Sequence, residues 1–156
     1  MVVPAWMPDD EVSRIIDSHR AWLARERAKQ RPRLRLDPRD VSETEARRAA
    51  RELIAMLIDE EAPELGVEPR CVQIRDQRSR WGSCSTRGTL SFNWRLVLAP
   101  FEVLDYVVVH ELCHLREPNH SRRFWGLVEC RRPDWRTRRD WLHEHGPELL
   151  AFRPAA

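Results

Sequence analysis

The chain has 156 residues, of which 42% are apolar, and this is long enough for one domain with a substantial core. Its net charge of +2 is close to neutral, so the composition does not indicate a nucleic-acid-binding protein. No apolar run approaches the roughly 20 residues that span a bilayer, and the start lacks the regions of a secretory signal. We therefore expect a cytoplasmic protein with no membrane partner.

Two helices are predicted in the first part of the chain. An amphipathic pattern covers residues 11–30, and residues 31–40 form a basic, proline-containing connector. Ser42 and Glu45 then form a capping box, which predicts the start of a second helix. We expect that helix to end at Pro63 and Gly66.

The apolar period then changes from that of a helix to that of strands. Val72 and Ile74 alternate with polar residues, and residues 90–96 do so as well, which predicts two strands. The Gly- and Ser-rich segment 78–89 between them is predicted to be a hairpin connection. Beyond Pro100, the apolar segment 101–115 is typical of a buried central helix.

Two shorter helices are expected after a break at residues 117–119. One runs through Phe124 and Val128, and the last extends from about Pro133 to a C-cap at Gly146. The four cysteines contain no close pair, so we expect buried or half-buried thiols and neither a disulfide nor a thiolate zinc site.

The buried central helix contains the motif HExxH in residues 110–114. Its two histidines, His110 and His114, are four residues apart and project from one helix face, where both can reach one metal ion. Glu111 lies at the edge of that face and can take a proton from a zinc-activated water without being a ligand. The motif predicts a zinc-dependent hydrolase with one Zn²⁺ per chain.

His120 is the expected third zinc ligand, because Pro118 breaks the helix and lets the chain fold back. Glu129 and Glu144 are the alternatives, since some zincins take a glutamate from the next helix. The spacing to His120 matches that of metzincins, but Glu117 replaces their glycine and no Met follows the motif.

The run from Arg80 to Trp125 resembles the YgjP-like metallopeptidase domain family, minimal zincins related to the SprT-like proteases. The matching segments are RWGSCS (80–85), GTLSFNWRL (88–96), DYVVVHELCHL (105–115) and NHS (119–121). The resemblance implies an α+β, zincin-like fold, with a small antiparallel sheet over the active-site helix and further helices around it. It also implies zinc ligands His110, His114 and His120, with Glu111 as base. We expect residues 41–156 to form this metallohydrolase domain and residues 1–40 to pack with it as one globular unit.

Three residues near the predicted hairpin are candidates for substrate binding: Ser83, Cys84 and Asn93. In zincins the strand beside the active-site helix can pair with an extended substrate, although Ser83 in a turn and Asn93 facing solvent are equally compatible with the pattern. Tyr106, four residues before His110, is either an oxyanion donor or a core residue.

A peptidase acting on a peptide or protein substrate is the leading functional hypothesis. One alternative is hydrolysis of a nucleotide phosphoanhydride, with phosphates held by Arg75, Arg78, Arg80 and Arg87. The other is a binding module on a zincin fold, in which the basic segment 120–140 contacts nucleic acid.

Overall fold

The computed structural model describes residues 40–154. The predicted helix at 11–30 and almost all of the connector at 31–40 lie outside the described residues. The expectation that the N-terminal segment packs with residues 41–156 therefore stays a prediction. No helix in the described range has the length and apolarity needed to cross a membrane.

The first described helix, α2 (Glu43–Leu65), begins as its capping box predicts. The backbone N–H of Glu45 donates to Ser42 Oγ at 3.2 Å, and the N–H of Ser42 donates to Glu45 Oε2 at 3.0 Å. The helix ends at Gly66, whose φ of 64° is the left-handed conformation that glycine adopts readily. Pro63 lies within the last turn and does not end the helix.

Three short strands form the sheet in the order β1-β3-β2. They are β1 (Cys71–Arg75), β2 (Gly82–Cys84) and β3 (Thr89–Asn93). β2 pairs antiparallel with β3, but β1 pairs parallel with it, with Val72 opposite Leu90. The expected α+β fold is thus confirmed, whereas the sheet is mixed and not wholly antiparallel.

The predicted hairpin between the two alternating segments is wrong, because those segments are the parallel neighbours β1 and β3. The true hairpin joins β2 and β3 through residues 85–88. The alternation at residues 90–96 also overestimates the strand: from Trp94 to Leu98 the chain is a 3₁₀ helix, η1. Asn93 causes the change, since its side-chain oxygen accepts the Arg95 N–H at 3.1 Å and caps η1.

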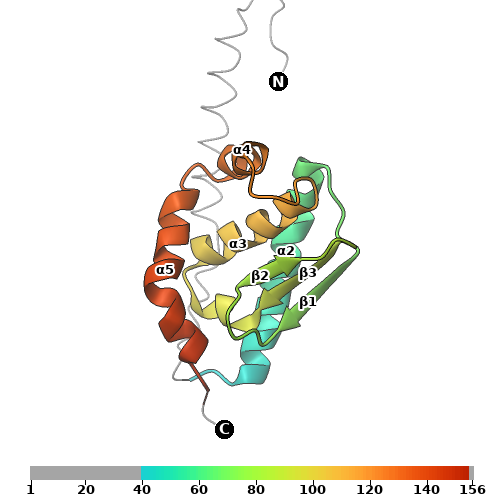
Figure 1. Cartoon of the computed structure of the whole chain (residues 1–156). Helices are drawn as coiled ribbons and strands as arrows, with labels where there is room; N and C mark the ends of the chain where they lie inside the picture. Colours follow the sequence, from blue (N-terminus) through green and yellow to red (C-terminus); the bar gives the residue numbers. More distant parts are fainter. Residues whose placement is uncertain (1–39, 155–156) are drawn as a thin grey trace, which may run out of the picture. The chain divides into compact units, whose positions relative to one another are not determined.

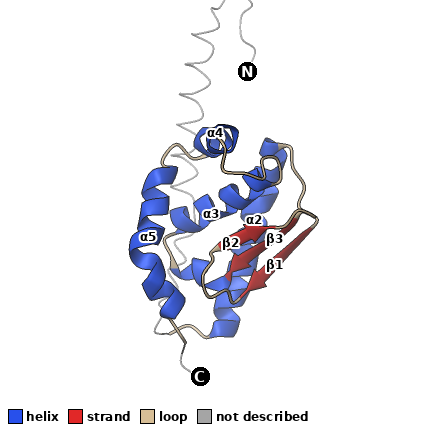
Figure 2. Ribbon diagram, viewed as in Figure 1, coloured by secondary structure: helices blue, strands red, loops and turns tan. Residues whose placement is uncertain are grey.

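The central helix α3 (Phe101–His114) carries the motif and is almost entirely buried, as predicted. It packs against α2, β2, α4 (Arg122–Arg131) and α5 (Trp135–Ala151). Figure 1 shows α3 in the middle of these elements, with the sheet in front of it and α4 across one end. In Figure 2 the helices lie against one face of the small sheet, and β2 is one of its two edge strands.

Helix α5 passes through Gly146, which was predicted to be its C-cap. This glycine is buried, and a Cβ at its position would lie 3.3 Å from the indole of Trp81. Gly146 therefore allows α5 to approach the segment before β2, and the helix continues for five more residues.

Candidate metal centre

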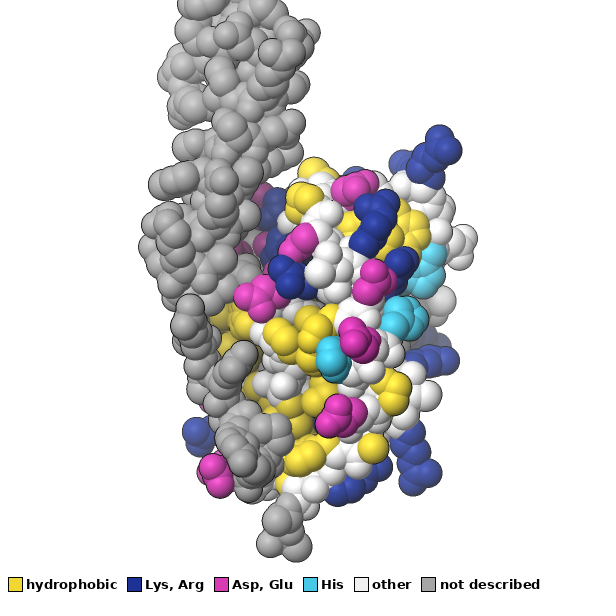
Figure 3. Space-filling model, turned by 90° about the vertical axis from the view of Figure 1, so that its left-hand side faces the viewer, with side chains coloured by type: hydrophobic (Ala, Val, Ile, Leu, Met, Phe, Trp, Pro, Cys, Tyr) yellow, Lys and Arg dark blue, Asp and Glu magenta, His cyan; other side chains and the backbone are white. Residues whose placement is uncertain are grey.

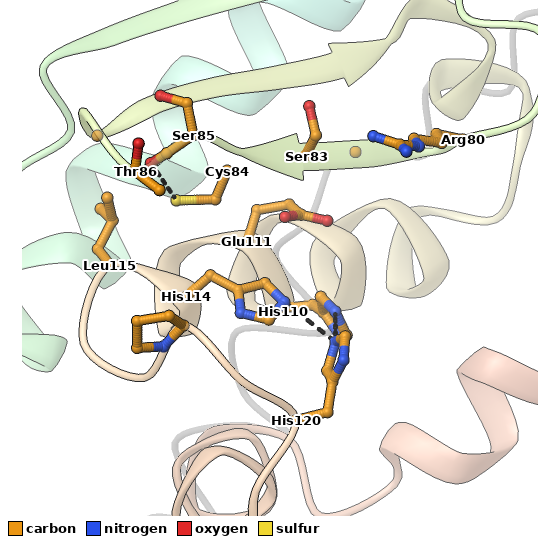
Figure 4. Close-up of a pocket in the computed structure, with 13 residues that line it drawn as sticks. Arg80, Ser83, Cys84, Ser85, Thr86, His110, Glu111, His114, Leu115 and His120 are labelled. Atoms are coloured by element: carbon orange, nitrogen blue, oxygen red, sulfur yellow. Dashed lines mark hydrogen bonds between the residues drawn. The ribbon is translucent and has the colours of Figure 1, made fainter.

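Three histidine nitrogens converge at the end of α3. His110 and His114 project from the same face of the helix, and His120 returns from the segment that follows it (Figure 4). The Nε2 of His120 lies 3.1 Å from the Nε2 of His110 and 3.1 Å from the Nε2 of His114. Two ligands 2.0–2.1 Å from a tetrahedral zinc ion are roughly 3.3 Å apart, so this spacing fits a metal ion.

Burial favours the neutral form of His110 and His114, which is the form that binds a metal ion. Burial, together with the neighbouring His114 and His120, lowers the pKa of His110 to about 3, and burial also lowers that of His114. The Nδ1 of His114 lies 3.1 Å from the carbonyl oxygen of Glu117, which can only accept. The proton of this ring therefore sits on Nδ1, and Nε2 presents its lone pair to the common point.

Two aromatic residues hold the histidine rings in place. The hydroxyl of Tyr106 lies 3.4 Å from His110 Nδ1, the nitrogen that faces away from the common point. Tyr106 is buried, and burial raises its pKa to about 12. Phe124 is fully buried, and its ring centroid lies between 4.4 and 4.9 Å from those of all three histidines.

Phe124 thus packs against all three imidazoles, whereas the sequence pattern identified it only as a residue of a short helix. Tyr106 was correctly placed on the histidine side of α3, but its hydroxyl contacts the ring nitrogen opposite the common point. The only sequence signal for either residue is its spacing from a histidine. Tyr106 precedes His110 by one turn of α3, and Phe124 lies four residues after His120, in the first turn of α4.

Glu111 lies between α3 and strand β2. Its side chain is buried against Gly82, where an added Cβ would lie 2.8 Å from Glu111 Cγ and Oε1. Burial raises the pKa of Glu111 to about 7. The carboxyl group can therefore both accept and release a proton near neutral pH, as a general base and acid must.

Both alternative third ligands lie away from the cluster. Glu129 is exposed and pairs with Arg136 at 3.1 Å, and Glu144 is exposed and lies 3.7 Å from His145. Among residues 40–154, the cluster of three or more potential ligands consists of His110, His114 and His120. The four cysteines lie outside it and are thiols, although Cys71 and Cys130 are exposed and not buried as expected.

A pocket of about 550 Å³ opens beside the histidines and is bounded by β2 on one side. Cys84 lies on the pocket side of β2, where burial and the nearby Glu111 raise its pKa. Ser83 also borders the pocket, but its side chain points to the opposite face of the strand (Figure 4), as the strand alternation requires.

Asn93 is not among the residues that line the pocket, so its predicted contact with substrate has no support from the pocket geometry. It is fully buried, and its side-chain nitrogen donates to the carbonyl oxygens of Gln77 at 2.7 Å and Arg80 at 3.2 Å. The partners of this side chain are thus backbone groups of the loop between β1 and β2, and Asn93 does not face solvent either.

Comparison with known proteins agrees with this geometry. A family model described as the YgjP-like metallopeptidase domain matches residues 36–145. The crystal structure of the metallopeptidase zymogen of Pyrococcus abyssi abylysin is similar, with a TM-score of 0.50 and 25% sequence identity over 61% of this chain and 92% of that chain. No curated protein matches the sequence.

Proposed function

The chain belongs to the YgjP-like metallopeptidase family, and we propose that it is a zinc-dependent peptidase with Glu111 as its general base. The supporting observation is the convergence of three Nε2 atoms beside a buried carboxyl group at a pocket edge. His110, His114 and His120 would hold the ion, leaving its fourth position open. Zinc in such a site polarises a carbonyl group and lowers the pKa of a coordinated water to about 7.

The protein's own residues supply the remaining requirements of peptide hydrolysis. Glu111 accepts a proton from the attacking water at its carboxylate and delivers it to the leaving nitrogen. Strand β2 has one edge paired with β3, and its other edge borders the pocket. An extended substrate can bind that edge through backbone hydrogen bonds, in which Ser83 and Cys84 take part through their peptide groups.

The direct test is to compare the wild type with Glu111→Gln. Protein purified without chelator should contain about one zinc per chain in both, because Glu111 is not a ligand. The wild type should cleave denatured casein, o-phenanthroline should stop the cleavage, and Glu111→Gln should lose it. Cleavage that persists in Glu111→Gln would contradict the proposed role of this residue.

The alternative of nucleic-acid binding is weakened because most arginines of the basic segment 120–140 are paired with acidic side chains. Six of its seven arginines form ion pairs with acidic residues, which are Glu61, Glu64, Asp105, Glu117, Glu129, Asp134 and Asp140. Basic and acidic side chains also lie beside one another on the face shown in Figure 3. A phosphate-binding surface needs unpaired positive charge, which this segment largely lacks.

A further inference from the structure

The exposed arginines around β2 differ from most arginines of α4 and α5, because they have no ionic partner among residues 40–154. Arg78, Arg80 and Arg87 are exposed, and none forms an ion pair or a side-chain hydrogen bond with any residue in the range 40–154. The sequence explains this, because residues 77–101 contain no Asp or Glu. Arg95, the fourth arginine there, is buried and pairs with Asp76.

Two of these arginines lie at opposite ends of the strand that borders the pocket. Arg80 lines the pocket two residues before β2, and Figure 4 shows its side chain at that end of the strand. Arg87 follows β2 at the other end, between Thr86 and Gly88, which both line the pocket. The two residues therefore flank a strand of about 10 Å.

The position of Arg80 is fixed by the fold. The buried side chain of Asn93 donates to the backbone carbonyls of Gln77 and Arg80, and the backbone N–H of Asn93 donates to the carbonyl of Trp81 at 2.9 Å. These bonds hold the segment before β2 against β3. The guanidinium of Arg80 thus extends from an ordered backbone at the pocket entrance, which lowers the entropy cost of binding.

The spacing of the charges favours an extended ligand over a compact one. A nucleotide triphosphate concentrates its charge and needs donors that converge on one point. Arg80 and Arg87 instead lie at two ends of a strand edge, where successive side chains of a bound peptide would reach them. Carboxylates match the forked donor geometry of arginine.

We propose that the cleft selects acidic peptide segments, with Asp or Glu side chains on both sides of the cleaved bond paired to Arg80 and Arg87. This inference rests on the proposed peptidase function and specifies its substrate class. The charges lie at the cleft rim, so they also increase the rate of encounter with acidic chains at low ionic strength.

The test uses cleavage sites in denatured casein, identified by mass spectrometry, to design two fluorogenic peptides that differ only in Glu or Gln beside the cleaved bond. The ratio of kcat/KM for the Glu peptide to that for the Gln peptide should be about 1.5-fold to fivefold in the wild type, the range that exposed ion pairs reach. The ratio should fall as salt is added.

The variants identify the residue responsible. Arg80→Gln should bring the ratio close to one, and Arg80→Glu should invert it, which a merely structural role would not do. Arg51→Gln is the matched control, because Arg51 is an exposed arginine on α2, away from the pocket lining, with no ion pair to a described residue. Its ratio should equal that of the wild type. A wild-type ratio near one, or an unchanged ratio in Arg80→Gln, would overturn the proposal.

A binding measurement that needs no known cleavage site separates this proposal from the proposed function. Fluorescence anisotropy compares two labelled, extended peptides of one sequence, which differ only in carrying Glu or Gln at the same positions, for binding to the zinc-loaded Glu111→Gln full chain. A preference for the Glu peptide with no cleavage by the wild type would support acidic-segment recognition and contradict the peptidase. Equal binding of both peptides, combined with nucleotide hydrolysis that Glu111→Gln loses, would overturn the acidic-peptide proposal.

Discussion

At the scale of single residues, the most specific prediction concerns His120 as the third zinc ligand. His120→Ala should lower zinc affinity by more than the roughly 10–100-fold that the loss of an outer partner costs, because a ligand is removed. Glu129→Ala should leave the affinity nearly unchanged, since Glu129 pairs with Arg136 on the surface. Competition with a chromophoric chelator measures both. Normal zinc content in His120→Ala would show that another residue completes the site.

Tyr106 gives a second prediction of this kind. Tyr106→Phe keeps the buried ring and removes only the hydroxyl beside His110 Nδ1. The imidazole then loses the partner that orients it, and zinc affinity should fall by about 10-fold. Chelator competition measures the loss, and an unchanged thermal unfolding midpoint of the zinc-free protein would show that packing is preserved. Wild-type affinity would mean that packing alone fixes His110.

The sequence predicts the site residues to the extent that their spacing is local. His110 and His114 lie on one helix face by geometry alone, and the break at Pro118 made the return of His120 foreseeable. The contacts of Phe124 and Asn93 were not foreseeable, because they depend on how separate elements meet. Asn93 shows this best: its partners, Gln77 and Arg80, are 16 and 13 residues away.

At the scale of elements, the close packing of β2 on α3 depends on Gly82. In Gly82→Ala the new Cβ would overlap the side chain of Glu111, and a displacement of about 1 Å in a catalytic group can cost roughly 100-fold in rate. We therefore expect Gly82→Ala to retain zinc and to lose most of its kcat/KM for casein peptides. Metal analysis and peptide kinetics on the same preparation test this.

Gly126 provides the matched control for that substitution. It lies within α4, and a Cβ there would meet no atom within 4 Å. Gly126→Ala should keep full activity and gain about 0.5–1 kcal/mol of stability, because alanine favours the helix. Equal activity in Gly82→Ala and the wild type would show that Glu111 tolerates the added methyl group.

Helices were predicted better than strand pairing, for a physical reason. The capping box of α2 and the apolar character of α3 are local properties, and both helices begin where expected. The parallel pairing of β1 with β3 joins segments separated by β2, and the alternating pattern carries no information on which strands are neighbours. The extent of α5 was underestimated because Gly146 serves packing against Trp81.

At the scale of the whole described unit, a buried ionic network joins three helices behind the catalytic face. Glu61 on α2 is 1% exposed and accepts from Arg131 at 2.8 Å and Arg132 at 3.0 Å. Arg132, at the end of α4, also donates to Asp105 on α3 at 2.6 and 2.7 Å. The network holds α3 from the side opposite its histidines, and removing one member would leave buried charge without a partner.

Glu61 makes the stability of this network depend on pH. Burial raises the pKa of Glu61, but the hydrogen bond from Arg131 and the charge of Arg132 more than offset it, so the pKa lies below the ordinary 4.5. A carboxyl group with a depressed folded-state pKa stabilises the fold above its unfolded pKa, and this contribution is lost as pH falls through the folded pKa. The contribution of Glu61 to the free energy of unfolding should therefore be constant above about pH 5.5 and decrease below about pH 4.5.

Glu61→Gln isolates this contribution from those of other acids. The variant should lose about 3–5 kcal/mol at pH 7, because the arginines remain charged and buried. Asp105 and the exposed Glu64, which pairs with Arg131, are present in both proteins and cancel in the difference. The nearby Cys113 stays a thiol, since burial and Glu61 raise its pKa to about 12. Urea unfolding between pH 3.5 and 7 should thus show a difference between wild type and Glu61→Gln that shrinks only below about pH 4.5. A difference that is the same at every pH would mean that Glu61 contributes by packing and not by its charge.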